Sequence, residues 1–275
     1  MLVENKLLID KNCPMCRIYG NCFEKVGWVD NQTVDSYQMV EKLVFNQVDA
    51  ERAKSEVALV DLKGGKVTYG VDAFIKIIAQ NHQWLGQLLF WRPIHFLLHK
   101  LYRFISFNRH VITGPQPITY QRDCTPPVHK VYRWIYIVFA AFITFLVLNQ
   151  FAILLSNHLG WEHAVGRELG LSFGQIIWQS VALFMLGQKG ILNYLGNMST
   201  ISLIGALCLL PILIINSFIT VPLMLLLLVF AGIVAFMFLL HMKRSKLLGL
   251  PTVISYSWVA YRLVFLILLL TIQLW

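Results

Sequence analysis

The sequence predicts an α/β N-terminal domain followed by an α-helical transmembrane domain of about five spans, and three observations lead to this division. Hydrophobic residues make up 57% of the 275 residues and charged residues only 13%, against about 45–50% and 25% in soluble chains. Residues 1–75 carry 9 basic and 11 acidic side chains, whereas residues 131–275 carry 7 and 2. Residues 76–130 between them carry 7 basic and 1 acidic, as a segment beside anionic lipid does. We therefore expect domains at 1–114 and 131–275 and a basic juxtamembrane linker at 115–130.

The first elements are predicted to be a buried strand and a helix. Residues 6–10 form a short apolar run that ends in Asp10, which is typical of a buried strand. Asn12 or Cys13 can cap the helix that follows, because Pro14 fits its first turn, where a missing N–H costs nothing. Three residues then recur at four-residue intervals, which predicts a buried helix face with Cys22 in the core rather than as a third redox thiol: Ile18, Cys22 and Val26.

A β-hairpin and a second helix complete the expected core of this domain. Residues 56–70 contain two apolar runs on either side of Gly64-Gly65, which is a hairpin signal. Residues 71–80 read as a helix with apolar Ala73, Ile77 and Ile78. Strand, helix, an ambiguous middle, hairpin and helix is the order of a thioredoxin-like sandwich.

The Cys13-x-x-Cys16 motif carries the chemistry. Cys13 is expected at the positive end of a helix dipole, where cysteine pKa values fall and the thiolate becomes the nucleophile. Cys16, one turn on, suits the resolving thiol that breaks a mixed disulfide. Arg17 adds nearby positive charge. Asp10 either accepts the proton of Cys16 or simply caps the turn.

A zinc half-site and a purely structural cysteine pair are the two alternatives for this motif. Structural zinc needs four ligands, and the remaining candidates are Cys22, Cys124 and His129. The sequence has no second Cys-x-x-Cys, and His95-x3-His99 lies in an apolar, basic stretch. We therefore expect no metal.

Several of these features together resemble the DCC family of predicted thiol-disulfide oxidoreductases. The resemblance rests on Ile9-Asp10-x-x-Cys13-x-x-Cys16, the hairpin, Tyr69-Gly70-x-Asp72-Ala73, Pro93, Leu101-Tyr102, Asn108-Arg109 and Gly114. It implies a thioredoxin-like fold over residues 5–114 and an activity of the protein-disulfide reductase type. Two departures stand out: Asp10-Lys11 replaces the usual Asp-Gly, and no proline between Pro14 and Pro93 corresponds to the thioredoxin proline that faces the cysteines.

Residues 84–108 are apolar, aromatic and basic, and two interpretations are open. The stretch is either an amphipathic helix on anionic lipid or the C-terminal helices of the domain packing on its sheet. A role in binding nucleic acid is not expected, since basic residues beside a membrane segment already have a partner.

Five apolar stretches predict membrane spans, at about 131–156, 171–187, 201–216, 218–240 and 253–274. The basic residues of the intervening loops orient them with the N-terminus inside and the C-terminus outside, and residues 188–200 and 241–246 are expected to be loops. Arg262 either has a function within its span or snorkels and pairs locally.

The sequence thus predicts a membrane-anchored thiol-disulfide oxidoreductase with Cys13 and Cys16 as its catalytic pair and Asp10, Pro14 and Arg17 in support. No organic cofactor is needed. The expected partners are a protein or small-thiol disulfide and the lipid bilayer; the pattern leaves the oligomeric state open. With no signal peptide at the start, the expected location is a bacterial inner membrane with the N-terminal domain in the cytosol. The alternative function is a transporter or scaffold whose N-terminal domain is a regulatory or metal-sensing module. Cys208 is the only cysteine in residues 131–275, so no thiol relay through the membrane is expected.

Overall fold

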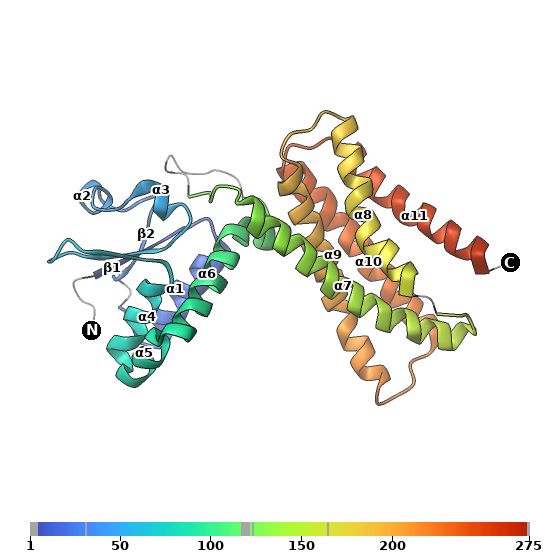
Figure 1. Cartoon of the computed structure of the whole chain (residues 1–275), viewed down its shortest axis with the longest axis horizontal. Coiled ribbons are helices and arrows are strands. Elements are labelled where there is room, and N and C mark those ends of the chain that lie inside the picture. The colour runs from blue at the N-terminus through green and yellow to red at the C-terminus, as the bar shows by residue number, and fades with distance from the viewer. Residues whose placement is uncertain (1–4, 31, 117–121, 123, 164, 274–275) are drawn as a thin grey trace. The chain divides into compact units, whose positions relative to one another are not determined.

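The computed structural model describes residues 5–30, 32–116, 122, 124–163 and 165–273. The chain folds into two compact units, Met1–Tyr132 and Arg133–Trp275 (Figure 1). The first unit contains a small mixed sheet with helices, and the second is helical.

Four strands form the sheet in the order β2-β1-β3-β4. They are β1 (Asn5–Ile9), β2 (Val34–Ser36), β3 (Ala58–Asp61) and β4 (Val67–Tyr69). β1 pairs parallel with β2 and antiparallel with β3, and β3 pairs antiparallel with β4. The predicted strand and hairpin are therefore present, and Gly65 gives the hairpin turn its positive φ of 65°, which glycine adopts at little cost.

The two faces of the sheet bury different side chains, because neighbouring residues of a strand point to opposite faces. Leu7, Ile9 and Leu59 pack against α1 (Pro14–Lys25) and α4 (Gly70–Asn81) in the cluster that also holds Cys13 and Cys16. On the other face, Leu8, Ala58 and Val60 form a cluster with Cys124. The short helices α2 (Lys42–Phe45) and α3 (Ala50–Ala53) lie on this second side (Figure 1).

The prediction that Cys22 faces the core is wrong. Ile18, Cys22 and Val26 do share one face of α1, but that face is exposed. The helix instead buries Cys16 and Gly20, and a Cβ on Gly20 would lie only 3.0 Å from Val34 Cγ1. Only a residue without a side chain fits at such a close contact between α1 and the sheet. The helix therefore buries the face that carries Gly20 rather than the face that carries Cys22.

The expected linker at 115–130 packs in part onto the first unit. Arg122 donates to the carbonyls of Tyr37 and Val40, at 3.3 and 2.9 Å, and its guanidinium lies over the Phe45 ring. The Cys124 side chain is buried in the cluster on the second face of the sheet. These two residues therefore belong structurally to the α/β unit.

The described part of the second unit contains five helices: α7 (Lys130–Leu159, starting in the first unit), α8 (Val165–Met185), α9 (Ile191–Asn216), α10 (Leu223–Leu247) and α11 (Val253–Gln273). The predicted loops at 188–200 and 241–246 are corrected, since most of the first lies in α9 and the second in α10. Polar groups there find partners on other helices: Arg244 donates to Asn197 Oδ1 at 3.1 Å, and Tyr136 bonds Thr200 at 2.7 Å. Such pairing lets polar residues continue a membrane helix.

Within the described residues, three helices and not five are long and apolar enough to cross a membrane: α7, α9 and α10. The prediction of five spans therefore exceeds what the helices support. α8 carries Arg167, Glu168, Gln175 and Gln179, and the apolar helical stretch counted in α11 is the shorter Val253–Leu268. The three apolar helices indicate a membrane protein. Within α11, the Arg262 guanidinium stacks over the Trp258 ring at 4.0 Å, a local contact of the kind expected.

Candidate functional site

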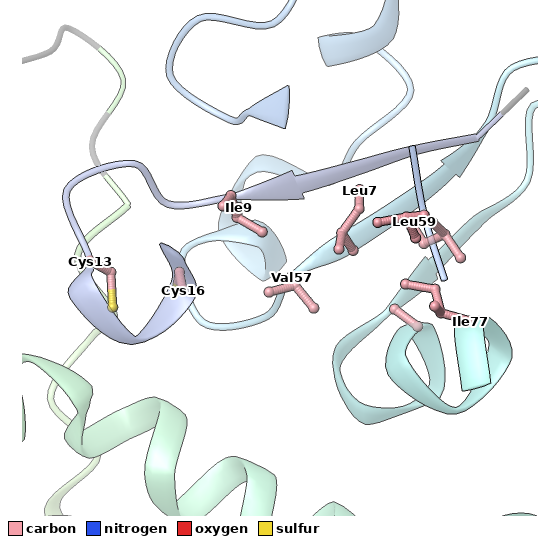
Figure 2. Packing of buried hydrophobic residues seen from close by; sticks show 9 residues of the cluster. Leu7, Ile9, Cys13, Cys16, Val57, Leu59 and Ile77 are labelled. Atoms are coloured by element: carbon pink, nitrogen blue, oxygen red, sulfur yellow. The ribbon is translucent and has the colours of Figure 1, made fainter. Parts of the chain in front are cut away.

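The two cysteines lie where β1 gives way to α1 (Figure 2). Cys13 is the N-cap residue, with extended backbone angles, and Pro14 occupies the first helical turn as predicted. Cys16 is on the same turn, and both side chains are buried, with 1% and 3% exposure. The cysteine spacing and the proline thus produce a dithiol at a helix N-terminus, where unpaired N–H groups favour a negative charge.

The surroundings shift the pKa values of the two thiols in opposite directions. A hydrogen bond with the Cys16 side chain lowers the pKa of Cys13 to about 6, and the charge of Arg109 adds to this, while burial and Asp10 oppose it. The pKa of Cys16 is strongly raised, first by its hydrogen bond to Cys13 and then by burial. At neutral pH the pair therefore holds one negative charge, centred on Cys13.

Asp10 acts as a structural anchor directly before the motif. Its Oδ1 accepts from the Asn12 N–H at 3.0 Å and from Gln38 Nε2 at 2.7 Å. Its Oδ2 forms an ion pair with Arg109 at 3.2 Å. The carboxylate therefore caps the turn, one of its two predicted roles; proton transfer from Cys16 stays a prediction.

Arg109, on α6 (Arg92–Thr113), is the buried cation of this site, and sequence reasoning gave it no role. Its Nη2 donates to Asp10, to the Lys54 carbonyl at 3.0 Å and to the Cys124 carbonyl at 2.5 Å. The predicted cation, Arg17, has an exposed side chain. The only sequence signal for Arg109 was its presence in the Asn-Arg pair of the family resemblance.

A small cavity of about 50 Å³ adjoins Cys16 and Arg109 and is lined further by Met15, Tyr19, Val57, Tyr102, Ile105 and Ser106. Val57 directly precedes β3 and shares the core cluster of both cysteines. Its backbone N–H donates to Tyr102 Oη at 3.0 Å. Tyr102 thus satisfies a backbone donor beside the dithiol, in a segment without proline.

The other candidate zinc ligands lie apart from the pair. Cys22 is exposed on the outer face of α1, and Cys124 is buried on the opposite face of the sheet from Cys13. His95 contacts Asp72 at 2.6 Å. Among the described residues, no group of three or more His, Cys, Asp or Glu side chains is placed to hold a metal ion.

A buried pair of cysteines at a helix N-terminus beside a mixed sheet is the arrangement that thiol-based redox domains use. A family model described as DCC1-like thiol-disulfide oxidoreductase matches residues 7–115. The family resemblance of the N-terminal part of the chain is therefore confirmed, and it supports a thioredoxin-like oxidoreductase. Comparisons with curated proteins and with solved structures give no match.

Proposed function

We propose that the chain is a membrane-anchored protein thiol-disulfide oxidoreductase of the protein-disulfide reductase type, with Cys13 as nucleophile and Cys16 as resolving thiol. The observation that carries the proposal is the placement of two buried thiols on the first turn of α1, close to the buried Arg109. The opposite directions of their pKa shifts are consistent with it. The family match favours this function over a transporter or scaffold with a metal-sensing module. The three apolar helices supply the anchor, with the N-terminal unit on the cytosolic side.

The reaction begins with the Cys13 thiolate. It attacks one sulfur of a substrate disulfide, forms a mixed disulfide and releases the other substrate sulfur as a thiolate. Because Cys13 is buried, a protein disulfide reaches it only after local opening of the site. The rate therefore depends both on the thiolate fraction and on that opening.

The second step uses a change that the first step produces. Once Cys13 is bonded to substrate, it is no longer a thiolate that accepts a hydrogen bond from Cys16. That hydrogen bond is the largest influence that raises the pKa of Cys16. Arg109, which lowers that pKa, then favours the Cys16 thiolate. This thiolate attacks Cys13, forms the Cys13–Cys16 disulfide and releases the second substrate thiolate. Two electrons have passed to the substrate, and a donor dithiol returns them to the pair.

Trapping of the mixed disulfide tests the division of roles. We expect full-length Cys16→Ser in detergent to accumulate a mixed disulfide with glutathione disulfide at Cys13, and Cys13→Ser to form none at Cys16, with the modified residue identified by mass spectrometry. Cys22→Ser is the matched control, because it removes an exposed thiol of the same helix and is expected to exchange as the wild type does. A mixed disulfide that forms through Cys16 in the Cys13→Ser variant would reverse the assignment.

A further inference from the structure

The helices α5 (Gln83–Phe90) and α6 expose an unusual number of large apolar side chains for the surface of an α/β unit. Four of them are between 61% and 68% exposed: Trp84, Trp91, Phe96 and Leu97. Three more are 45–50% exposed: Leu88, Phe90 and Leu101. We call these seven residues the aromatic surface. Isolated exposed apolar residues are common, but such a concentration on two adjoining helices marks an interaction surface.

The aromatic surface is arranged along the helices in regular rows. Trp84 and Leu88 are one turn apart on α5, Trp91 joins α5 to α6, and Leu97 and Leu101 are one turn apart on α6. The opposite side of α6 faces the redox site through Tyr102, Ser106 and Arg109. The helix therefore uses one side for the core, and the side chains of its other side are exposed.

The charged side chains of α5 and α6 are all basic, and the acidic neighbour on α4, Asp72, is paired with His95 at 2.6 Å. Residues 73–122 contain no acidic residue, and Arg92 and Lys100 are exposed on α6. The Lys100 ammonium lies 5.3 Å from the centre of the Phe96 ring, so positive charge and aromatic surface are intermixed. Tryptophan, phenylalanine and leucine beside arginine and lysine are the side chains of helices that lie in the plane of an anionic membrane surface.

We propose that α5 and the N-terminal half of α6 bind the surface of an anionic lipid bilayer, with the aromatic surface inserted among the lipid headgroups. The same chain carries three helices that are apolar and long enough to cross a membrane, which favours a lipid bilayer as the partner of this surface. The proposal does not depend on the chemistry of the thiols.

Lipid photolabelling of the full-length protein in nanodiscs tests this. A phospholipid with a photoactivatable acyl chain is incorporated, and labelled peptides are identified by mass spectrometry. We expect label on peptides from residues 83–103, with a several-fold higher yield in phosphatidylglycerol discs than in phosphatidylcholine discs. High salt should remove that difference, because it screens exposed charges.

Variants separate the surface from general lipid contact. Trp84→Gln with Trp91→Gln should remove most label from these peptides and leave that on α7, α9 and α10 unchanged. Ile18→Gln, at an exposed apolar residue of α1, is the matched control and should change nothing. Absence of label from residues 83–103, or equal labelling of the α1 peptide, would overturn the proposal. Chemical crosslinks from this segment to the second unit or to another copy of the chain would also overturn it, by showing that protein covers the surface.

Discussion

Arg109 lies beside the dithiol, although it is more than 90 residues away from both cysteines in the sequence. It is buried, pairs with Asp10 and donates to two backbone carbonyls. A buried cation beside a thiolate stabilises the charged form. We regard it as a positioning residue that also supplies the positive field, whereas the exposed Arg17 is screened by solvent.

Replacement of Arg109 should weaken the thiolate. We expect Arg109→Gln to raise the pKa of Cys13 from about 6 toward its ordinary value of 9.0, because the favourable charge is lost, while Arg109→Lys keeps most of the effect. A higher pKa leaves less thiolate, so exchange at neutral pH should fall roughly tenfold. For the wild type, exchange should fall as the pH drops through about 6. The measurement is the exchange rate of the full-length protein as a function of pH.

Arg17→Gln serves as the control for that experiment, since it removes an exposed cation from the same helix as the cysteines. Its pH profile should match that of the wild type. A larger change in Arg17→Gln than in Arg109→Gln would contradict the role given to Arg109. Because Arg109→Gln also leaves the buried Asp10 carboxylate without its ion-pair partner, it should cost about 3–5 kcal/mol of stability. If the single variant does not fold, the comparison of Asp10→Asn with the Asp10→Asn, Arg109→Gln double variant keeps the test valid, because Asp10 itself raises the pKa of Cys13.

The cysteines, the capping position and Pro14 were predictable because they act within a few neighbouring residues. Arg109 was not, since its contacts with Asp10 and Lys54 join residues 99 and 55 positions apart. No local periodicity reports such contacts. Gln38, which binds Asp10 across 28 positions, was missed for the same reason.

Among the elements, α4 and α5 pack unusually closely. A Cβ placed on Gly86 of α5 would lie 2.7 Å from the Cα of Ala79 on α4 and would overlap the Ala79 side chain. Two small residues therefore let the two helices approach one another, and this fixes the position of α5.

Gly86→Ala should destabilise the first unit. Alanine in an open helix is favoured over glycine by about 1 kcal/mol, but here the overlap forces the helices apart at an expected cost of about 1–3 kcal/mol. Gln87→Ala, at an exposed site of α5, is the matched control and should be nearly neutral. Thermal unfolding of the full-length variants in detergent measures the difference. An unchanged or raised melting temperature for Gly86→Ala would mean that α5 moves freely against α4.

Element prediction succeeded where the local pattern was strong. β1, the hairpin and α4 follow clear apolar runs and a Gly-Gly turn, whereas β2 is three residues long and reads Val-Asp-Ser, too short for any pattern. In α9, Asn197, Ser199 and Thr200 resemble a loop in sequence, yet they are buried within the helical unit. Only contacts between helices explain why they are helical.

At the scale of the whole molecule, the number of crossings decides where each loop lies. If α7, α9 and α10 each cross the membrane, the two termini lie on opposite sides of it. With the N-terminus in the cytosol, three crossings also place Lys243 and Lys246 outside, whereas the positive-inside rule places such residues in the cytosol. The count of three crossings and the positive-inside rule both place the C-terminus outside. They place the C-terminal end of α10 on opposite sides of the membrane.

Topology reporters fused at two positions distinguish three membrane crossings from five. We expect a reporter after Trp275 to be outside, because an odd number of crossings separates the termini. A second reporter at Gly249 should also be outside if only α7, α9 and α10 cross. A cytosolic Gly249 with an external C-terminus would mean that α8 and α11 cross as well. A cytosolic C-terminus would contradict the proposed orientation or an odd count.

The hydrogen bond from Arg109 to the Cys124 carbonyl has a consequence for the order of events during biosynthesis. A chain is made from its N-terminus and begins to fold as it emerges. Both thiols and Arg109 leave the ribosome before the Cys124 carbonyl that Arg109 binds, and α7 begins at Lys130, only shortly after. The last hydrogen-bond acceptor of Arg109 therefore emerges just ahead of the first apolar helix long enough to cross a membrane. A nascent chain that stops at Gly114 has both cysteines but an unfinished electrostatic environment, so maturation of the thiol site and delivery to the membrane are linked in time by chain order alone.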